Sequence, residues 1–229
     1  MTNDKLKSNN NKIFIFILVA LFFGLNHVMR GQKNEWNDLS FYEVGNEPKH
    51  TTFKYFTNKQ TALTYDFDNS PFYKSLNGTW KFAWYRKPAD RIVNFFDTDF
   101  DASNWGKIKV PGDWQFQGYD VPIDFNNGYP FERNAPKAPQ NYNPVGQYIY
   151  EFKVPKVWDG KQIYLHLAGV NSAFYIWLNG KNIGYHEDSK VPAEFNITNY
   201  ITKGSNKIAN DYYKKYSRKN QAVEIQKLI

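Results

Sequence analysis

The sequence contains no cysteine among its 229 residues. Disulfide frameworks, zinc–thiolate sites and thiol nucleophiles are therefore excluded. Histidine is also rare, and no two histidines stand at the spacing of metal ligands. We interpret them as ordinary polar residues and predict no metal site in this chain. The four histidines are His27, His50, His166 and His186.

Net charge is nearly absent from the middle of the chain. Residues 1–31 carry four Lys or Arg and one acid, and residues 203–229 carry seven and two. The chain's net charge of +7 therefore lies at its two ends, and residues 32–202 have a net charge of −1. Phosphate binding needs Lys and Arg clustered on a folded surface, so we predict no nucleic-acid partner.

Only one long hydrophobic run is present, IFIFILVALFFGL at residues 13–25, and three lysines precede it. A charged segment followed by a short apolar segment is typical of an export signal. As a helix this run would span roughly 20 Å, which is shorter than the ~30 Å of a hydrocarbon core. We predict that residues 1–31 are a signal peptide. Because no Ala-x-Ala cleavage pattern follows the run, an uncleaved anchor remains an alternative. Either one predicts an exported protein, periplasmic or extracellular.

Helical periodicity is scarce, and alternation of apolar residues dominates from residue 78 onward. Residues 78–85 (GTWKFAWY) and 147–154 (QYIYEFKV) each place their aromatic residues on one face of a strand. Residues 172–178 (SAFYIWL) are followed by Asn179-Gly180, the strongest short-range signal of a hairpin. Short strands at this spacing predict an all-β fold, a jelly-roll β-sandwich.

Residues 110–144 are long and irregular and contain six of the chain's 11 prolines. Loops of this length in a compact domain are usually functional. Aromatic rings in such a loop either complete the core or stack on the flat face of a sugar. Four rings are least explained by strand alternation and are our candidates for sugar stacking: Trp114, Tyr119, Tyr129 and Phe131.

Several long motifs resemble one family, the family 2 glycoside hydrolases, and specifically the N-terminal part of bacterial β-galactosidases. The resemblance runs in order from about residue 34 to residue 209. The segments that carry it are NEWNDL (34–39), LNGTWKFAWY (76–85), VPGDWQFQGYDVPI (110–123), NGYPFERNAP (127–136) and GVNSAFYIWLNGKNIGYHEDSKVPAEFNIT (169–198).

The resemblance implies a galactose-binding-like jelly roll that packs on a downstream barrel and binds carbohydrate, a β-galactoside. It places the catalytic pair, two glutamates about 5 to 5.5 Å apart, on that barrel, so we expect no catalytic residue here. It implies a substrate-binding role for Asn134, whose amide both donates and accepts hydrogen bonds; the alternative is that Asn134 caps its own turn. It implies no cofactor in this chain, because the Mg or Na ions of the family bind through residues absent here.

Two acidic motifs resemble catalytic signatures without their context. Gly45-Asn46-Glu47 resembles the sequence around the family's acid/base residue, but that residue belongs at the end of a barrel strand. We therefore predict that Glu47 is not catalytic. The adjacent Glu187 and Asp188 would point apart on an extended chain. For both motifs we favour a role in ordering a loop.

The motifs divide the chain into a signal or anchor (1–31), a lead-in segment (32–75), a sandwich (76–209) and a basic tail (210–229) that departs from the family. The departure indicates a frameshift or premature stop, and predicts a sandwich that lacks its last strands and keeps an unpaired edge. The leading hypothesis is a β-galactosidase fragment whose partner is the remainder of the enzyme. The alternatives are a free-standing secreted carbohydrate-binding module and an inactive remnant.

Overall fold

The computed structural model describes most of the chain between residues 35 and 228. The described residues are Glu35, Asp38, 40–51, 53–66, 68–121, Pro139, 141–188, 191–213 and, for the backbone alone, 223–228. Contacts divide the chain into two units, 1–35 and 36–229, and the fold below is that of the second unit.

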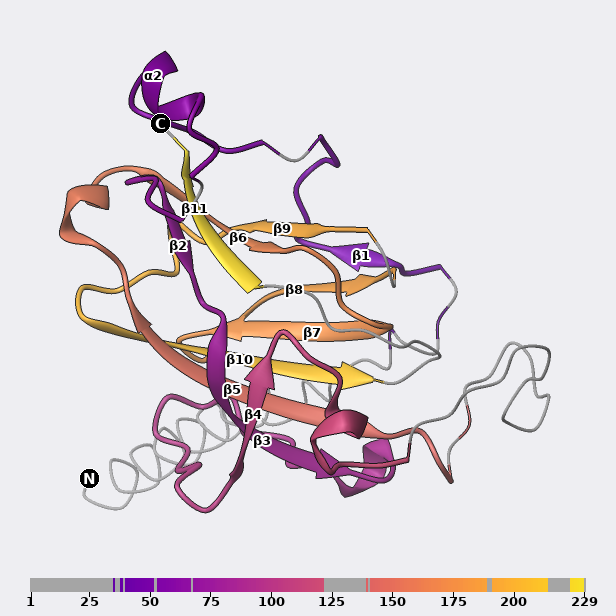
Figure 1. Ribbon diagram of the computed structural model, residues 1–229. Helices are drawn as coiled ribbons and strands as arrows, with labels where there is room; N and C mark the ends of the chain where they lie inside the picture. The colour runs from indigo at the N-terminus through magenta and orange to yellow at the C-terminus, as the bar shows by residue number, and fades with distance from the viewer. Residues whose placement is uncertain are drawn as a thin grey trace, which may run out of the picture. The chain divides into compact units, whose positions relative to one another are not determined.

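The described chain is nearly all β-structure, in two antiparallel sheets (Figure 1). The larger sheet has seven strands in the order β1-β8-β7-β10-β5-β3-β4, and the smaller has four in the order β2-β11-β6-β9. The strands are β1 (Glu43–Val44), β2 (Tyr73–Ser75), β3 (Gly78–Tyr85), β4 (Gly106–Val110), β5 (Val145–Lys153), β6 (Gln162–Leu167), β7 (Ala173–Leu178), β8 (Lys181–Glu187), β9 (Ala193–Asn196), β10 (Ser205–Tyr213) and β11 (Val223–Leu228).

Helical structure is limited to single turns among the described residues. They are α2 (Lys59–Ala62) and three 3-10 turns, Pro88–Asp90, Trp114–Gln117 and Lys156–Trp158. The predicted all-β sandwich of antiparallel sheets is confirmed.

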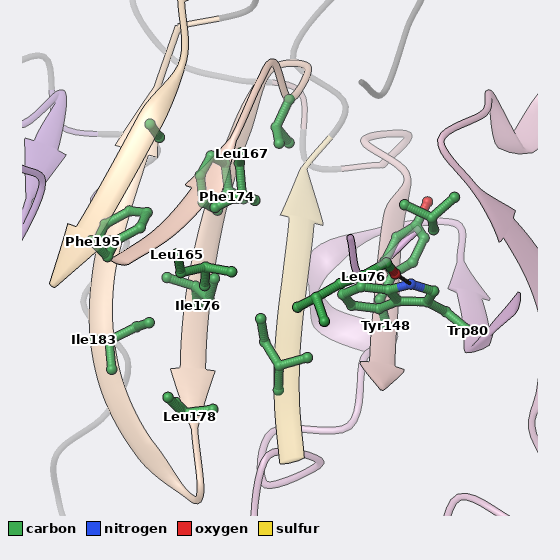
Figure 2. Close-up of a cluster of buried hydrophobic side chains, with 14 of the residues drawn as sticks. Leu76, Trp80, Tyr148, Leu165, Leu167, Phe174, Ile176, Leu178, Ile183 and Phe195 are labelled. Atoms are coloured by element: carbon green, nitrogen blue, oxygen red, sulfur yellow. Dashed lines mark hydrogen bonds between the residues drawn. The ribbon is translucent and has the colours of Figure 1, made fainter. Parts of the chain in front are cut away.

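The main core lies between the two sheets, and Figure 2 shows its central side chains. Leu165 and Leu167 of β6 face Phe174 and Ile176 of β7, and all four are at most 1% exposed. The alternating aromatic residues of β3 and β5 pack in the same cluster, as their period of two predicts. Burial of this apolar surface, about 25 cal/mol per Å², is the main stabilising contribution to the fold.

A second cluster lies on the opposite face of the seven-stranded sheet. Tyr175 and Trp177 of β7 point to this face, and residues 91–105 cover them with aromatic side chains. Phe95 is 1% exposed, and Phe96 stacks on Trp177 with ring centroids 4.7 Å apart. β7 is therefore buried on both faces, which explains why all six of its residues are buried.

The predicted hairpin joins β7 and β8. Asn179 has a φ of 52° and Gly180 a φ of 79°, the positive values that a type I′ turn requires. The Asn179 amide also donates to the Tyr200 carbonyl and to Asn206 Oδ1, both at 2.8 Å. The turn residue thus sets the hairpin geometry and also ties the hairpin to the start of β10.

The segments on either side of the predicted sandwich contribute strands to it. The lead-in supplies β1 and β2, and the predicted boundary after residue 209 falls inside β10, which pairs with β5 and β7 through Tyr213. Within residues 210–229, β11 pairs with both β2 and β6. Backbone pairing needs no alternation of side chains. The composition of residues 210–229 therefore did not indicate β11 or the end of β10.

The hydrophobic run at residues 13–25 lies outside the described residues. Within the described part of the chain, no helix has the length and apolar character needed to cross a membrane.

Candidate functional site

The two ends of the long irregular stretch come together beside the ends of β3 and β5. Asp120 near its start accepts a hydrogen bond from the Tyr142 hydroxyl near its end, at 2.5 Å. The Arg86 guanidinium lies 4.9 Å from the centre of the Tyr142 ring, and the Asn143 N–H donates to the Arg86 carbonyl. These contacts join the two ends of the loop next to the end of β3, and we call this region the loop base.

Burial and the hydrogen bond to Asp120 together raise the pKa of Tyr142 well above its usual value. The hydroxyl therefore stays protonated in neutral solution and donates to Asp120 as a fixed part of the loop base. This polar pair joins positions 120 and 142 directly.

Trp114 begins a 3-10 turn at the start of the loop, and its indole is 5% exposed. The ring covers Gly146 of β5, where an added Cβ would lie 2.3 Å from Trp114 Cζ3. Gly146 pairs with Trp84 of β3. The indole N–H groups of Trp84 and Trp114 are buried and lack a hydrogen-bond partner in the described part of the chain. The loop base thus holds two buried donors that no described residue satisfies.

The rest of the 3-10 turn is tied to the edge of the larger sheet. The Gln117 side-chain amide accepts from the Lys109 N–H at 2.7 Å and donates to the Lys109 carbonyl at 3.0 Å, as a neighbouring strand would. Tyr119 packs edge-on against Phe82 with ring centroids 4.6 Å apart. Phe116, in the same turn, is 80% exposed.

The sequence-based site residues divide into two groups. Trp114 and Tyr119 are described, and both pack against the main core beneath the loop. Asn134, Tyr129 and Phe131 lie outside the described residues. Contact of any of these five side chains with a sugar stays a prediction.

The Gly45-Asn46-Glu47 motif joins the edges of the two sheets. Asn46 Oδ1 accepts from the Glu194 N–H of β9 at 2.8 Å, and the Glu47 N–H donates to the Glu194 carbonyl at 2.7 Å. Gly45 has a φ of 72°, and an added Cβ would lie 2.4 Å from the Ile183 carbonyl oxygen of β8. Only glycine fits where the chain passes this close to β8. Steric fit therefore explains the glycine of this motif.

The second acidic motif also has structural contacts. The Glu187 carboxylate accepts from the Tyr185 hydroxyl, and the Glu187 N–H donates to the Tyr42 carbonyl at 2.7 Å. Among the described residues, no group of three His, Cys, Asp or Glu side chains has the geometry of a metal site.

Sequence reasoning missed one polar cluster. His50 and His166 both contact the carboxylate of Glu194, at 3.0 and 3.2 Å. Position 50 lies 144 residues from position 194, so no local spacing pattern could have related them. Only pairing of β6 with β9, and the path of the lead-in, bring these side chains together.

We expect Gly146→Ala to destabilise the protein by about 1–3 kcal/mol, as overpacking of a tight core does. The new methyl group would meet both the Trp114 ring and the Phe82 ring, at 2.3 and 2.8 Å. Urea unfolding followed by tryptophan fluorescence measures the loss. Lys153→Ala, an exposed change in the same strand, should stay within about 0.5 kcal/mol of the wild type. Equal stability of the two variants would show that Trp114 does not sit on Gly146.

Comparison with known proteins relates this fold and loop to one family. Residues 73–224 match the family described as glycosyl hydrolases family 2, sugar binding domain. The β-galactosidase of Priestia megaterium is 40% identical over 185 residues, which cover 79% of this chain and 18% of that protein. The β-galactosidase large subunit of Leuconostoc lactis is 34% identical over 197 residues, or 79% of this chain and 31% of that one.

Solved structures agree at the level of the fold. A β-glucuronidase of Bacteroides uniformis superposes with a TM-score of 0.51 at 22% identity, over 68% of this chain and 18% of that one. A family 2 glycosyl hydrolase of Bacteroides cellulosilyticus gives 0.50 at 20% identity, over 68% and 20%. The family match covers more than half of the residues, and the architecture agrees with it. The chain therefore belongs to glycoside hydrolase family 2, through the sugar-binding domain of that family.

Proposed function

We propose that this chain is the N-terminal sugar-binding domain of a β-galactosidase, and that it acts in the hydrolysis of terminal β-galactosides only together with a catalytic barrel. The observation that carries the proposal is the 40% identity over 185 residues to a β-galactosidase. The chain spans about a fifth of that relative's length. We infer that its partner is the remainder of such an enzyme.

The loop base supports carbohydrate as the ligand. Asn134 and the candidate stacking rings Tyr129 and Phe131 belong to the segment between the two ends that Asp120 and Tyr142 join. Trp84 and Trp114 also lie at that base, and their buried indole N–H groups have no hydrogen-bond partner among the described residues. An amide side chain and aromatic rings in one segment suit the hydroxyl groups and flat faces of a sugar.

The alternative of a free-standing carbohydrate-binding module has one observation in its favour. β11 pairs on one side with β2 and on the other with β6. The smaller sheet thus has no gap within it, as a module that folds alone requires. Both proposals predict that the isolated chain binds sugar. Only the first proposal predicts hydrolysis when a catalytic barrel is supplied.

The test uses the 229-residue protein with two assays. We expect no turnover of a chromogenic β-galactoside above the buffer blank, because the proposal places both catalytic glutamates on the barrel. We expect NMR shift perturbations with methyl β-galactoside that are stronger than those with methyl β-glucuronide. Turnover that disappears in Glu47→Gln would overturn the assignment of Glu47 as structural. A preference for the glucuronide, or no binding of either sugar, would contradict the proposed sugar class.

A further inference from the structure

The Glu194 carboxylate is held between two histidines from different parts of the chain. Glu194 lies on β9, an edge strand of the smaller sheet. Its Oε2 contacts His166 Nδ1 of β6 at 3.2 Å, and its Oε1 contacts His50 Nε2 of the lead-in at 3.0 Å. The side chains of Glu194 and His166 are 11% and 6% exposed, whereas that of His50 is 39% exposed. His166 thus forms the fixed side of the cluster and His50 the exposed side.

The contacts of His50 favour its charged form. Its Nδ1 lies 2.9 Å from the Thr51 carbonyl oxygen, and its Nε2 faces Glu194 Oε1. A carbonyl and a carboxylate only accept hydrogen bonds, so both ring nitrogens must donate, and only the imidazolium form carries two N–H groups. The Phe53 ring, 5.0 Å from the His50 ring, also favours a cation.

The same contacts hold the lead-in on β9. Glu47 and Asn46 satisfy the carbonyl and the N–H of Glu194, while His50 binds its carboxylate. The backbone of this edge strand is therefore covered by the lead-in at position 194. Loss of the proton from His50 would place a nitrogen lone pair opposite the carboxylate and remove the attraction.

We propose that His50, Glu194 and His166 form a latch that holds residues 46–51 on the edge of the smaller sheet while His50 is doubly protonated, and that loosens when His50 becomes neutral. The proposal does not depend on which sugar the domain binds. It assigns a role to the lead-in, namely a cover over strand β9 that responds to pH.

The direction of the effect follows from the partners of His50. The hydrogen bonds to Thr51 and then to Glu194 raise the pKa of His50 above its ordinary value, and those from His166 and His50 outweigh burial and lower the pKa of Glu194. A raised folded-state pKa gives stability that is complete below about pH 6.5 and is lost as the pH rises through the folded value. The latch therefore closes in acid and opens in base.

Other groups face the cluster from the lead-in and from β6. Tyr164 interacts electrostatically there with Glu47, Glu194 and Tyr55. Lys49 lies 3.9 Å from Glu43 of β1 instead. Burial raises the pKa of Tyr164, so it stays neutral through the range in which imidazoles titrate. The titration on which the latch depends is therefore that of His50.

The experiment measures hydrogen-exchange protection factors for the Glu47 and Glu194 amides of the 229-residue protein between pH 5.5 and pH 8.5. We expect protection in the wild type to fall by about two- to fivefold across the His50 titration, the range that exposed ion pairs contribute. In His50→Gln it should be low and independent of pH. Lys49→Gln removes a neighbouring positive charge but no bond to Glu194, and should behave as the wild type does.

A second measurement separates the latch from general loosening of the lead-in. Histidine NMR should place the His50 midpoint above the ordinary value in the wild type and lower in Glu194→Gln, an isosteric change that keeps both backbone hydrogen bonds. A His50 midpoint that does not move in Glu194→Gln would overturn the proposal. So would His50→Gln protection factors that fall with pH as steeply as those of the wild type.

Discussion

Replacing Phe95 with alanine should lower the free energy of unfolding by about 3–5 kcal/mol, the usual loss when a buried phenylalanine is truncated. Phe95 is 1% exposed and lies against Trp105 and Trp177, with ring centroids 6.0 and 5.5 Å away. Its ring anchors residues 91–105 on the outer face of the larger sheet. Removing it leaves a cavity and also exposes apolar side chains of β7.

Denaturant unfolding measures the loss, and the fluorescence of Trp177 in the native baseline reports whether the cover has lifted. Val93→Ala is the matched control, since Val93 lies in the same segment but is 61% exposed. It should change stability by no more than about 0.5 kcal/mol. A Phe95→Ala loss below 1 kcal/mol would be inconsistent with a cover that buries the second face of the sheet.

Asp211→Asn should stabilise the protein at neutral pH by about 2–3 kcal/mol and have little effect near pH 4. Asp211 is fully buried on β10. It accepts from Arg91 Nε at 3.1 Å and from the Tyr213 hydroxyl at 3.0 Å, both through Oδ2. Its Oδ1 and the Oε1 of Gln147, which is directly opposite in the ladder, have no hydrogen-bond partner in the described structure.

Burial raises the pKa of Asp211 to about 6, despite the opposing effect of Arg91. The native state therefore binds a proton that the unfolded chain, with an ordinary aspartate pKa near 3.9, has already lost. Stability must fall as the pH rises from about 4 to about 6, and at 1.36 kcal/mol per pKa unit the total is about 3 kcal/mol. An asparagine cannot ionise, and its amide suits the unpaired oxygen of Gln147.

The measured quantity is the difference in free energy of unfolding between wild type and variant at each pH. The difference is needed because other carboxylates make stability rise with pH. Glu194, for example, has a lowered pKa. Asp159→Asn, at an exposed position, serves as the control and should leave the curve unchanged. A constant difference between Asp211→Asn and the wild type from pH 4 to pH 7 would rule out titration of Asp211 in this range.

Two neighbouring polar side chains of β10 are buried with incomplete hydrogen bonding. At both Asn210 and Asp211, on opposite faces of the strand, one buried oxygen has no hydrogen-bond partner among the described residues. Native cores rarely leave such groups unsatisfied. The backbone ladder continues through these residues while their side chains fit poorly. The family match itself runs through residue 224, so the departure from the family at residue 210 stays a prediction.

Local sequence determined strands β3 and β5 and the hairpin of β7 and β8. Alternation in β3 and β5 fixed which side chains face the core, and Asn179-Gly180 fixed the turn, because both signals act over a few residues. The family motifs likewise follow the order of the chain. From these features the sandwich and its membership of glycoside hydrolase family 2 could be predicted.

Tertiary structure alone decided what covers each face and edge. β7 contains only aromatic and aliphatic residues, so its sequence could not show that residues 91–105 are the segment that buries its second face. The His50–Glu194–His166 cluster and the Arg91–Asp211 pair join positions that are far apart along the chain, the latter by 120 residues. Such contacts depend on which strands become neighbours, and that choice is made by packing of the whole core rather than by any local pattern.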